Sequence, residues 1–98
     1  MELNSKQRSY LRSCAQSLDP VVMVGKDGMK ESLFTALDEA LHCHELVKVR
    51  FVAHKDEVKE LAFTLEEKTN STLVAVTGFT ALYFRQDKKD RSERIYHI

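Results

Sequence analysis

A short apolar run at residues 21–24, Val-Val-Met-Val, stops at two glycines three positions apart, and this boundary constrains the fold more than any other feature. The run lacks the alternation of polar and apolar residues, as is typical of a short strand buried on both faces in a parallel sheet. A helical pattern of apolar residues begins close behind it, near Met29. The chain is therefore expected to pass from a strand through the loop 25–28 into a helix.

The loop itself, Gly25-Lys26-Asp27-Gly28, is suited to phosphate. Glycine has no Cβ, so the backbone can approach a ligand closely, and the first turn of a helix presents unpaired N–H groups and a partial positive charge. Lys26 in the loop and Lys30, one turn into the expected helix, add positive charge. The same residues also fit an ordinary strand-to-helix turn in which glycine supplies a positive φ. The residues alone leave both interpretations open.

Hydrophobic periodicity predicts three helices and four strands in the order α-β-α-β-α-β-β. The expected helices span residues 5–17, 28–43 and 55–69, and the expected strands span 21–24, 46–52, 72–77 and 79–85. Asn4 with Gln7 resembles a capping box, and Gly78 is expected to close a hairpin. Two strand-helix-strand crossovers followed by a hairpin predict a two-layer α/β sandwich with a mixed four-stranded sheet.

The length of 98 residues and the hydrophobic content of 43% fit one compact domain. We expect this domain to occupy residues 1–86 and to be followed by a charged tail, 87–98. The tail is expected to be mobile, with docking of Ile95, Tyr96 and Ile98 as a short extra strand as the alternative. Without a membrane-spanning run or a signal peptide, the chain is expected to be a cytoplasmic monomer with no membrane partner.

The formal net charge is zero, yet the charges are unevenly distributed. Residues 1–30 hold five basic and three acidic side chains, residues 31–67 hold four and nine, and residues 68–98 hold six and three. Such a field steers an anionic partner toward one side of a molecule and repels it from the other. Arg8 and Arg12 lie one turn apart on the first helix, where like charges repel unless an anion covers them. RNA is one such anion, and two solvated arginines are the alternative.

Catalytic, metal and cofactor chemistry is not indicated by the sequence. His42, Cys43 and His44 are adjacent, but helical spacing points them in different directions, so they cannot share one metal ion. His44 falls on the apolar arc and is expected to be a core or helix-end histidine. Phe63 lies outside the apolar arc of the third helix, so we expect it to pack against the sheet edge or the first helix, with an exposed contact aromatic as the alternative.

Three separated segments of the chain resemble one known family. They are Lys6-Gln7-Arg8 with Tyr10-Leu11-Arg12, then the segment 19–28 (DPVVMVGKDG), then the segment 44–49 (HELVKV). Val76-Thr77-Gly78 and Arg85 extend the match. Together they are similar to the CRM domain (chloroplast RNA splicing and ribosome maturation) in its stand-alone bacterial YhbY form.

The resemblance implies a non-enzymatic RNA-binding protein. Its sheet and two helices would be similar to the carboxyl-terminal domain of translation initiation factor three, with an added amino-terminal helix. The partner implied is ribosomal RNA in precursors of the large ribosomal subunit, whose assembly the protein would assist. The RNA-binding residues that the resemblance implies are the G-x-x-G loop and the basic positions: Gly25, Lys26, Asp27, Gly28, Lys6, Arg8, Arg12, Lys48 and Arg85. Lys30 joins them for its charge beside the loop.

The residues also leave a second function open, that of a protein-interaction adaptor without direct RNA contact. It would use Phe63, the acidic outer faces of the helices or the charged tail. The acidic residues of the segment 31–67 favour this alternative, because an acidic surface repels nucleic acid.

Overall fold

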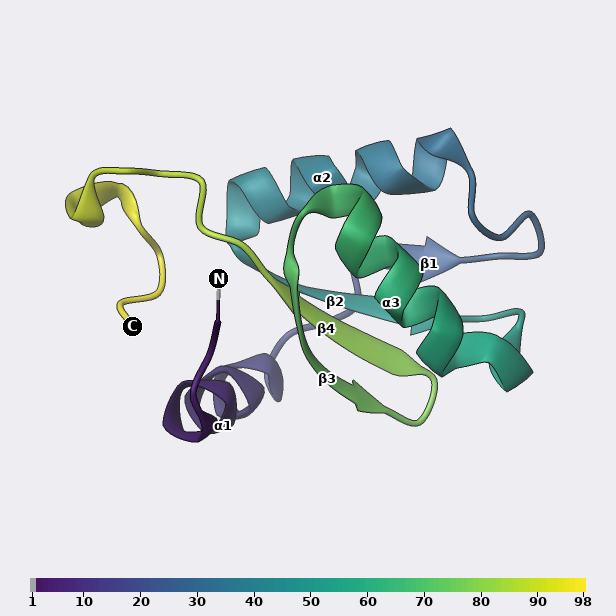
Figure 1. Ribbon diagram of the computed structural model, residues 1–98, viewed down its shortest axis with the longest axis horizontal. Helices are drawn as coiled ribbons and strands as arrows, with labels where there is room; N and C mark the ends of the chain where they lie inside the picture. The colour runs from purple at the N-terminus through teal and green to yellow at the C-terminus, as the bar shows by residue number, and fades with distance from the viewer. Residues whose placement is uncertain (1) are drawn as a thin grey trace.

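The computed structural model describes residues 2–98 and shows an α/β fold with the expected order of elements (Figure 1). The elements are α1 (Ser5–Ala15), β1 (Val22–Val24), α2 (Glu31–His44), β2 (Leu46–Phe51), α3 (Val58–Thr69), β3 (Thr72–Thr77) and β4 (Thr80–Phe84). Short 3₁₀ turns at Lys55–Glu57 and Arg91–Glu93 precede α3 and follow β4. The fold class predicted from the sequence is therefore confirmed.

The sheet is mixed and has the strand order β1-β2-β4-β3. Strands β1 and β2 are parallel, with Val22 opposite Val49 and Val24 opposite Phe51. Strand β4 is antiparallel to both β2 and β3. Because β1 and β2 run the same way, the loop after β1 and the end of β2 lie at the same end of the sheet.

Helices α2 and α3 cover one face of the sheet, and α1 lies on the other (Figure 1). The core under α2 and α3 combines residues of these two helices with strand residues that alternate with those facing α1. It contains Val22, Val24, Leu33, Leu37, Leu41, Val47, Val49, Phe51, Val58, Ala62, Leu65, Ala81 and Tyr83. The smaller core under α1 contains Leu3, Leu11, Ala15, Leu46, Val74, Leu82 and Phe84. The sheet is thus covered on both faces, although α1 is only 11 residues long and leaves part of its face open.

The capping box at the start of α1 is present as expected. Asn4 Oδ1 accepts a hydrogen bond from Gln7 N at 2.8 Å, and Gln7 Oε1 accepts one from Asn4 N at 3.0 Å. Together the two side chains satisfy donors that the first turn leaves unpaired.

Helix α2 begins later than predicted, at Glu31 instead of residue 28. Gly28 adopts a φ of 67°, which is incompatible with a right-handed helix, so the helix starts only after this residue. Lys30 has an extended backbone and is the N-cap residue. The prediction that Lys30 lies one turn inside the helix is therefore wrong.

The C-terminal segment 87–98 returns to the body of the molecule and does not form a strand. Glu45, which is 1% exposed, accepts hydrogen bonds through Oε1 from the backbone N–H groups of Ile95 and Tyr96, both at 3.0 Å. The Tyr96 ring packs edge-on against Phe84, with the ring centroids 6.2 Å apart. Glu45 thus anchors the segment beside the α1 core, while the division of the chain at residue 86 stays a prediction.

Of two placements predicted from helical periodicity, one is confirmed in part and the other is wrong. His44 is a helix-end residue, one of its two expected positions, and it is exposed instead of in the core, because α2 ends at this residue and the chain turns there through Glu45 with a φ of 65°. Phe63 is 57% exposed instead of packed against the sheet edge or α1. Among residues 2–98, no helix combines the length and apolar character that a membrane crossing requires.

Candidate functional site

The loop 25–28 forms a tight turn between β1 and α2. Gly28 N donates to Gly25 O at 3.1 Å, which closes the turn, and Lys30 N donates to Gly28 O at 3.1 Å. The positive φ of Gly28 redirects the chain toward α2, so the need for a positive φ in the turn explains this glycine. Gly25 has no positive φ, and a Cβ at this position would have no atom within 4 Å. Local conformation therefore explains the second glycine and not the first.

His54 braces the loop from the far end of β2. Its Nε2 donates to the carbonyl oxygen of Lys26 at 2.8 Å. A Cβ on Gly28 would lie 3.3 Å from the same nitrogen, so the imidazole ring leaves little room for a side chain at position 28. This contact could not be predicted from the sequence, because the two partners are 28 residues apart and a single histidine after a strand forms no recognisable motif.

A set of backbone N–H groups at this end of the molecule donates to no acceptor within residues 2–98. In the loop they belong to Lys26, Asp27 and Met29, and in the first turn of α2 they belong to Glu31 and Ser32. The N-cap side chain makes no capping hydrogen bond that would satisfy them. Unpaired N–H groups together with the helix dipole favour an anion at this position.

The two lysines at the loop differ in their partners. Lys30 Nζ lies 2.9 Å from Asp27 Oδ2, and both side chains are exposed. This hydrogen bond lowers the pKa of Asp27. Lys26 has no ion-pair partner among the described residues. Of the two, Lys26 is the one whose charge is immediately available to a ligand.

A shallow pocket of about 320 Å³ adjoins the loop. The loop contributes both glycines and Asp27, and Lys30 follows at the N-cap of α2. The apolar part of the wall comes from β1, the residue before it and α2: Val21, Val22, Met23, Leu33 and Ala36. Val21 and Met23 are 57% and 52% exposed. The loop thus opens onto the surface of the edge strand β1.

A second hollow, which we call the basic groove, lies between the end of α1 and the sheet. Its volume is about 400 Å³, and its walls comprise Arg12, Ala15, Gln16, Lys48, Ala75, Thr77, Thr80 and Leu82. Lys48 Nζ donates to Leu18 O at 2.8 Å, which fixes this ammonium at the groove. Two of the predicted RNA-binding residues, Arg12 and Lys48, are therefore brought together, with no carboxylate in the wall.

Arg50 connects the loop pocket with the basic groove. It is opposite Met23 of the loop pocket in one strand pair and opposite Thr80 of the groove in the other. Its side chain is exposed and lies on the same face of β2 as that of Lys48, two residues before it. Sequence reasoning missed Arg50 as a candidate, although its position two residues after Lys48 was the available signal.

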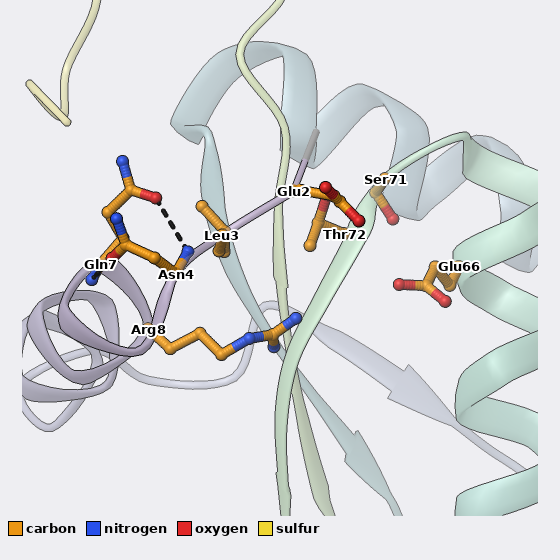
Figure 2. A pocket seen from close by; sticks show the side chains of 8 residues that line it. All are labelled: Glu2, Leu3, Asn4, Gln7, Arg8, Glu66, Ser71 and Thr72. Carbon is orange, nitrogen blue, oxygen red and sulfur yellow. Dashed lines mark hydrogen bonds between the residues drawn. The ribbon is translucent and has the colours of Figure 1, made fainter.

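Arg8 does not form an outward-facing pair with Arg12. Figure 2 shows its side chain reaching from α1 toward β3, where Nη1 donates to Leu73 O at 2.9 Å and Val74 O at 2.8 Å. Successive carbonyls normally point to opposite sides of a strand, and the β-bulge between Leu73 and Ala75 lets one arginine reach both. Arg8 thus holds α1 against the edge strand and is not a solvated arginine beside Arg12, while the RNA contact predicted for it stays a prediction.

The pocket around Arg8 is less suited to an anion than the basic groove. It has a volume of about 620 Å³ and includes the carboxylates of Glu2 and Glu66 (Figure 2). Glu66 Oε2 accepts a hydrogen bond from Leu73 N at 2.6 Å. Arg8 and Glu66 together occupy backbone groups at the start of the edge strand, which blocks pairing with another strand there.

Arg85 lies at the opposite end of the sheet and is only 15% exposed. Its Nη1 donates to Asp38 Oδ1 at 2.7 Å and to Thr69 O at 2.6 Å, while Nη2 donates to Asp38 O at 3.1 Å. Nε and Nη2 donate to the two carboxylate oxygens of Asp87 at 2.8 and 2.9 Å. All five N–H groups are therefore used to join α2, the end of α3 and the C-terminal segment.

The RNA-contact role predicted for Arg85 stays a prediction that this geometry does not favour. Lys6 is exposed on α1 and forms no ion pair or hydrogen bond within the described part of the chain, so it is free to add to the basic surface. The structure thus brings the loop, Arg12 and Lys48 near one continuous surface and commits Arg8 and Arg85 to internal contacts.

Comparison with known proteins gives consistent matches over nearly the whole chain. A model of the CRS1 / YhbY (CRM) domain matches residues 3–85. The chain is 33% identical over 90 residues to the Bacillus subtilis protein named "Probable RNA-binding protein YqeI", covering 91% of this chain and 94% of that one. It is 31% identical over 88 residues to a Haemophilus influenzae protein named "RNA-binding protein", covering 89% of both.

A solved structure also resembles this one. The solution structure of a hypothetical protein from Staphylococcus aureus matches with a TM-score of 0.78 at 39% identity, covering 93% of this chain and 96% of that chain. The matched region of the family model extends from before α1 to the end of β4, so it includes the loop and the basic groove.

Proposed function

Because the chain belongs to the CRS1 / YhbY (CRM) domain family, as its motifs indicated, we propose that it binds RNA through the loop 25–28 and the basic groove. In this proposal a backbone phosphate accepts hydrogen bonds from the unpaired N–H groups of the loop and of the first turn of α2. Lys26 adds charge at that phosphate, and Arg12, Lys48 and Arg50 extend the contact across the sheet. The relatives named as RNA-binding proteins support RNA as the ligand class.

The observation that carries the loop assignment is the difference between its two glycines. Gly28 is explained by its left-handed backbone, whereas Gly25 has neither a positive φ nor a neighbour that excludes a side chain. A bare backbone beside unpaired N–H groups suits a ligand that approaches the main chain closely. In the absence of a bound ligand, nothing local requires glycine at this position.

We further propose that the RNA is ribosomal RNA in precursors of the large ribosomal subunit and that the protein is a cytoplasmic, non-enzymatic assembly factor. The role implied by the resemblance to bacterial stand-alone CRM proteins supports this assignment. Contact with phosphates alone requires no nucleophile, general base or metal ion. A formal net charge of zero is compatible with such a role, because Arg12 and Lys48 line a groove that contains no carboxylate.

Fluorescence anisotropy with a labelled large-subunit RNA fragment tests the proposed surface. The double variant Arg12→Ala/Arg50→Ala should weaken binding about tenfold or more, whereas Lys59→Ala, an exposed cation on α3, should leave it unchanged. Contact with about four phosphates of a single strand predicts a log–log salt slope near −3, and the double variant should make it less steep by about 1–2. Equal affinities for all three proteins would refute the assignment.

The exposure of Phe63 favours a second candidate, a protein-interaction adaptor. This ring is 57% exposed on α3 beside the acidic outer face of the helices. Affinity capture from a lysate with and without ribonuclease separates the two functions. Partners that survive digestion and are lost in Phe63→Ser support the adaptor, whereas partners lost on digestion support RNA binding.

A further inference from the structure

The basic groove is hollow because α1 is short. The helix ends at Ala15, so it covers only part of this face of the sheet. At that place β3 presents a small side chain, Ala75, opposite Leu82 of β4. The basic groove is therefore open on this face of the sheet, with a volume of about 400 Å³.

The basic groove combines an apolar floor with a polar rim. Ala15, Ala75 and Leu82 provide the floor, and the rim carries the amide of Gln16 and the hydroxyl groups of Thr77 and Thr80. An apolar floor accommodates the face of a planar ring, while amide and hydroxyl groups both donate and accept hydrogen bonds at its edge. This combination suits a nucleobase better than a phosphate, which requires no apolar surface.

The basic groove differs in charge from the three other pockets described for residues 2–98. The loop pocket contains Asp27, the pocket around Arg8 contains two glutamates, and the pocket at the start of α3 contains three carboxylates. The basic groove contains no carboxylate, and it holds Arg12 and the ammonium of Lys48 that Leu18 O fixes in place. The groove therefore suits a ligand that has a negative charge for the two cations and a planar ring for the apolar floor.

We infer that the basic groove receives one unpaired nucleobase of the bound RNA, with Arg12 and Lys48 at the phosphates beside it. This inference rests on the proposed RNA binding and deepens it. A base inside a duplex is stacked and paired, and removing it from the helix costs a few kcal/mol. The protein therefore prefers RNA with unpaired nucleotides over fully paired RNA of the same length.

Methyl NMR tests the inference directly, because each of five groove residues carries a methyl group: Ala15, Ala75, Thr77, Thr80 and Leu82. An inserted base shifts these methyl signals through its ring current, and a short single-stranded oligonucleotide should produce such shifts. A blunt duplex of the same length should shift the amide signals of the loop 25–28 without moving the groove methyls. Loop shifts with motionless groove methyls in both titrations overturn the inference and leave the proposed function standing.

The variant Ala75→Ile fills the basic groove and leaves the net charge of the protein unchanged. Position 75 is half-buried on a strand, where isoleucine is favoured. The variant should weaken single-strand binding about tenfold and leave duplex binding unchanged, because only the base contact is lost. Thr35→Ile on the exposed face of α2 is the matched control. Equal single-strand affinities in Ala75→Ile and the control overturn the inference. If neither RNA shifts any signal of the unmodified protein, the proposed function is refuted as well.

Discussion

Substitution of the two loop glycines separates their conformational role from their ligand-binding role. Gly28→Ala places a Cβ on a residue with a φ of 67° and 3.3 Å from His54 Nε2. Gly25→Ala and the bulkier Gly25→Leu place side chains where a Cβ meets no atom within 4 Å. The first change therefore affects the folded loop, and the other two affect only what approaches it.

The magnitudes follow from these geometries. A left-handed backbone costs an ordinary residue about 1–2 kcal/mol, so Gly28→Ala should lower the melting temperature by about 4–16 °C in a domain of this size. Gly25→Ala should alter stability by less than about 1 kcal/mol in either direction. Gly25→Leu should weaken RNA binding about 10- to 100-fold, because loss of one charge-assisted hydrogen bond costs about 1.5–3 kcal/mol.

Circular dichroism melting gives the stabilities, and fluorescence anisotropy at constant salt gives the affinities. The expected pattern is a destabilised Gly28→Ala protein and a stable Gly25→Leu protein that binds RNA weakly. If Gly25→Leu keeps full affinity and stability, the loop is only a turn, and the phosphate assignment is wrong.

Three further predictions concern charged side chains. Arg85→Lys should lower the free energy of unfolding in urea by about 2–4 kcal/mol, since lysine cannot replace the five-donor clamp, and an unchanged midpoint would contradict that role. Asp27→Asn should raise RNA affinity about threefold or more in anisotropy titrations by releasing Lys30, and unchanged affinity would show that Lys30 lies outside the contact. The pKa of Asp87 is lowered, first by its hydrogen bond from Arg85, so the stability it contributes is present above its ordinary pKa of 3.8 and is lost as the pH falls through the lowered value. Melting of Asp87→Asn between about pH 5 and 2 should therefore depend less on pH than melting of the unmodified protein, and identical profiles would contradict it.

Local signals in the sequence were sufficient for the fold. The Asn4 capping box, the alternation along β2 and the glycine at the β3–β4 turn each depend on neighbours within a few residues. Helical periodicity could not decide between a core position and a helix-end position for a residue at the end of an element. His44 continues the apolar arc of α2 in sequence, but the helix ends at this residue and leaves it exposed.

The candidate site was less predictable, because charge alone does not reveal a side chain's partner. Arg8 and Arg12 are indistinguishable in sequence, yet Arg8 donates to two carbonyls of β3 while Arg12 lines the groove. The clamp of Arg85 and the brace of His54 likewise join residues far apart in the chain. The glycines between an apolar strand and a helical pattern located the loop, the family resemblance added Lys48, and Arg50 came from the register of the sheet.

Titration of the ¹⁵N-labelled protein with a large-subunit RNA fragment maps the RNA-binding surface residue by residue. We expect the largest changes in amide signals at residues 25–32, where the unpaired N–H groups of the loop and of the first turn of α2 would meet a phosphate, with further changes along β2. If the RNA binds while these signals stay in place and those of α3 around Phe63 move, the RNA-binding surface assigned to the loop and the basic groove is wrong.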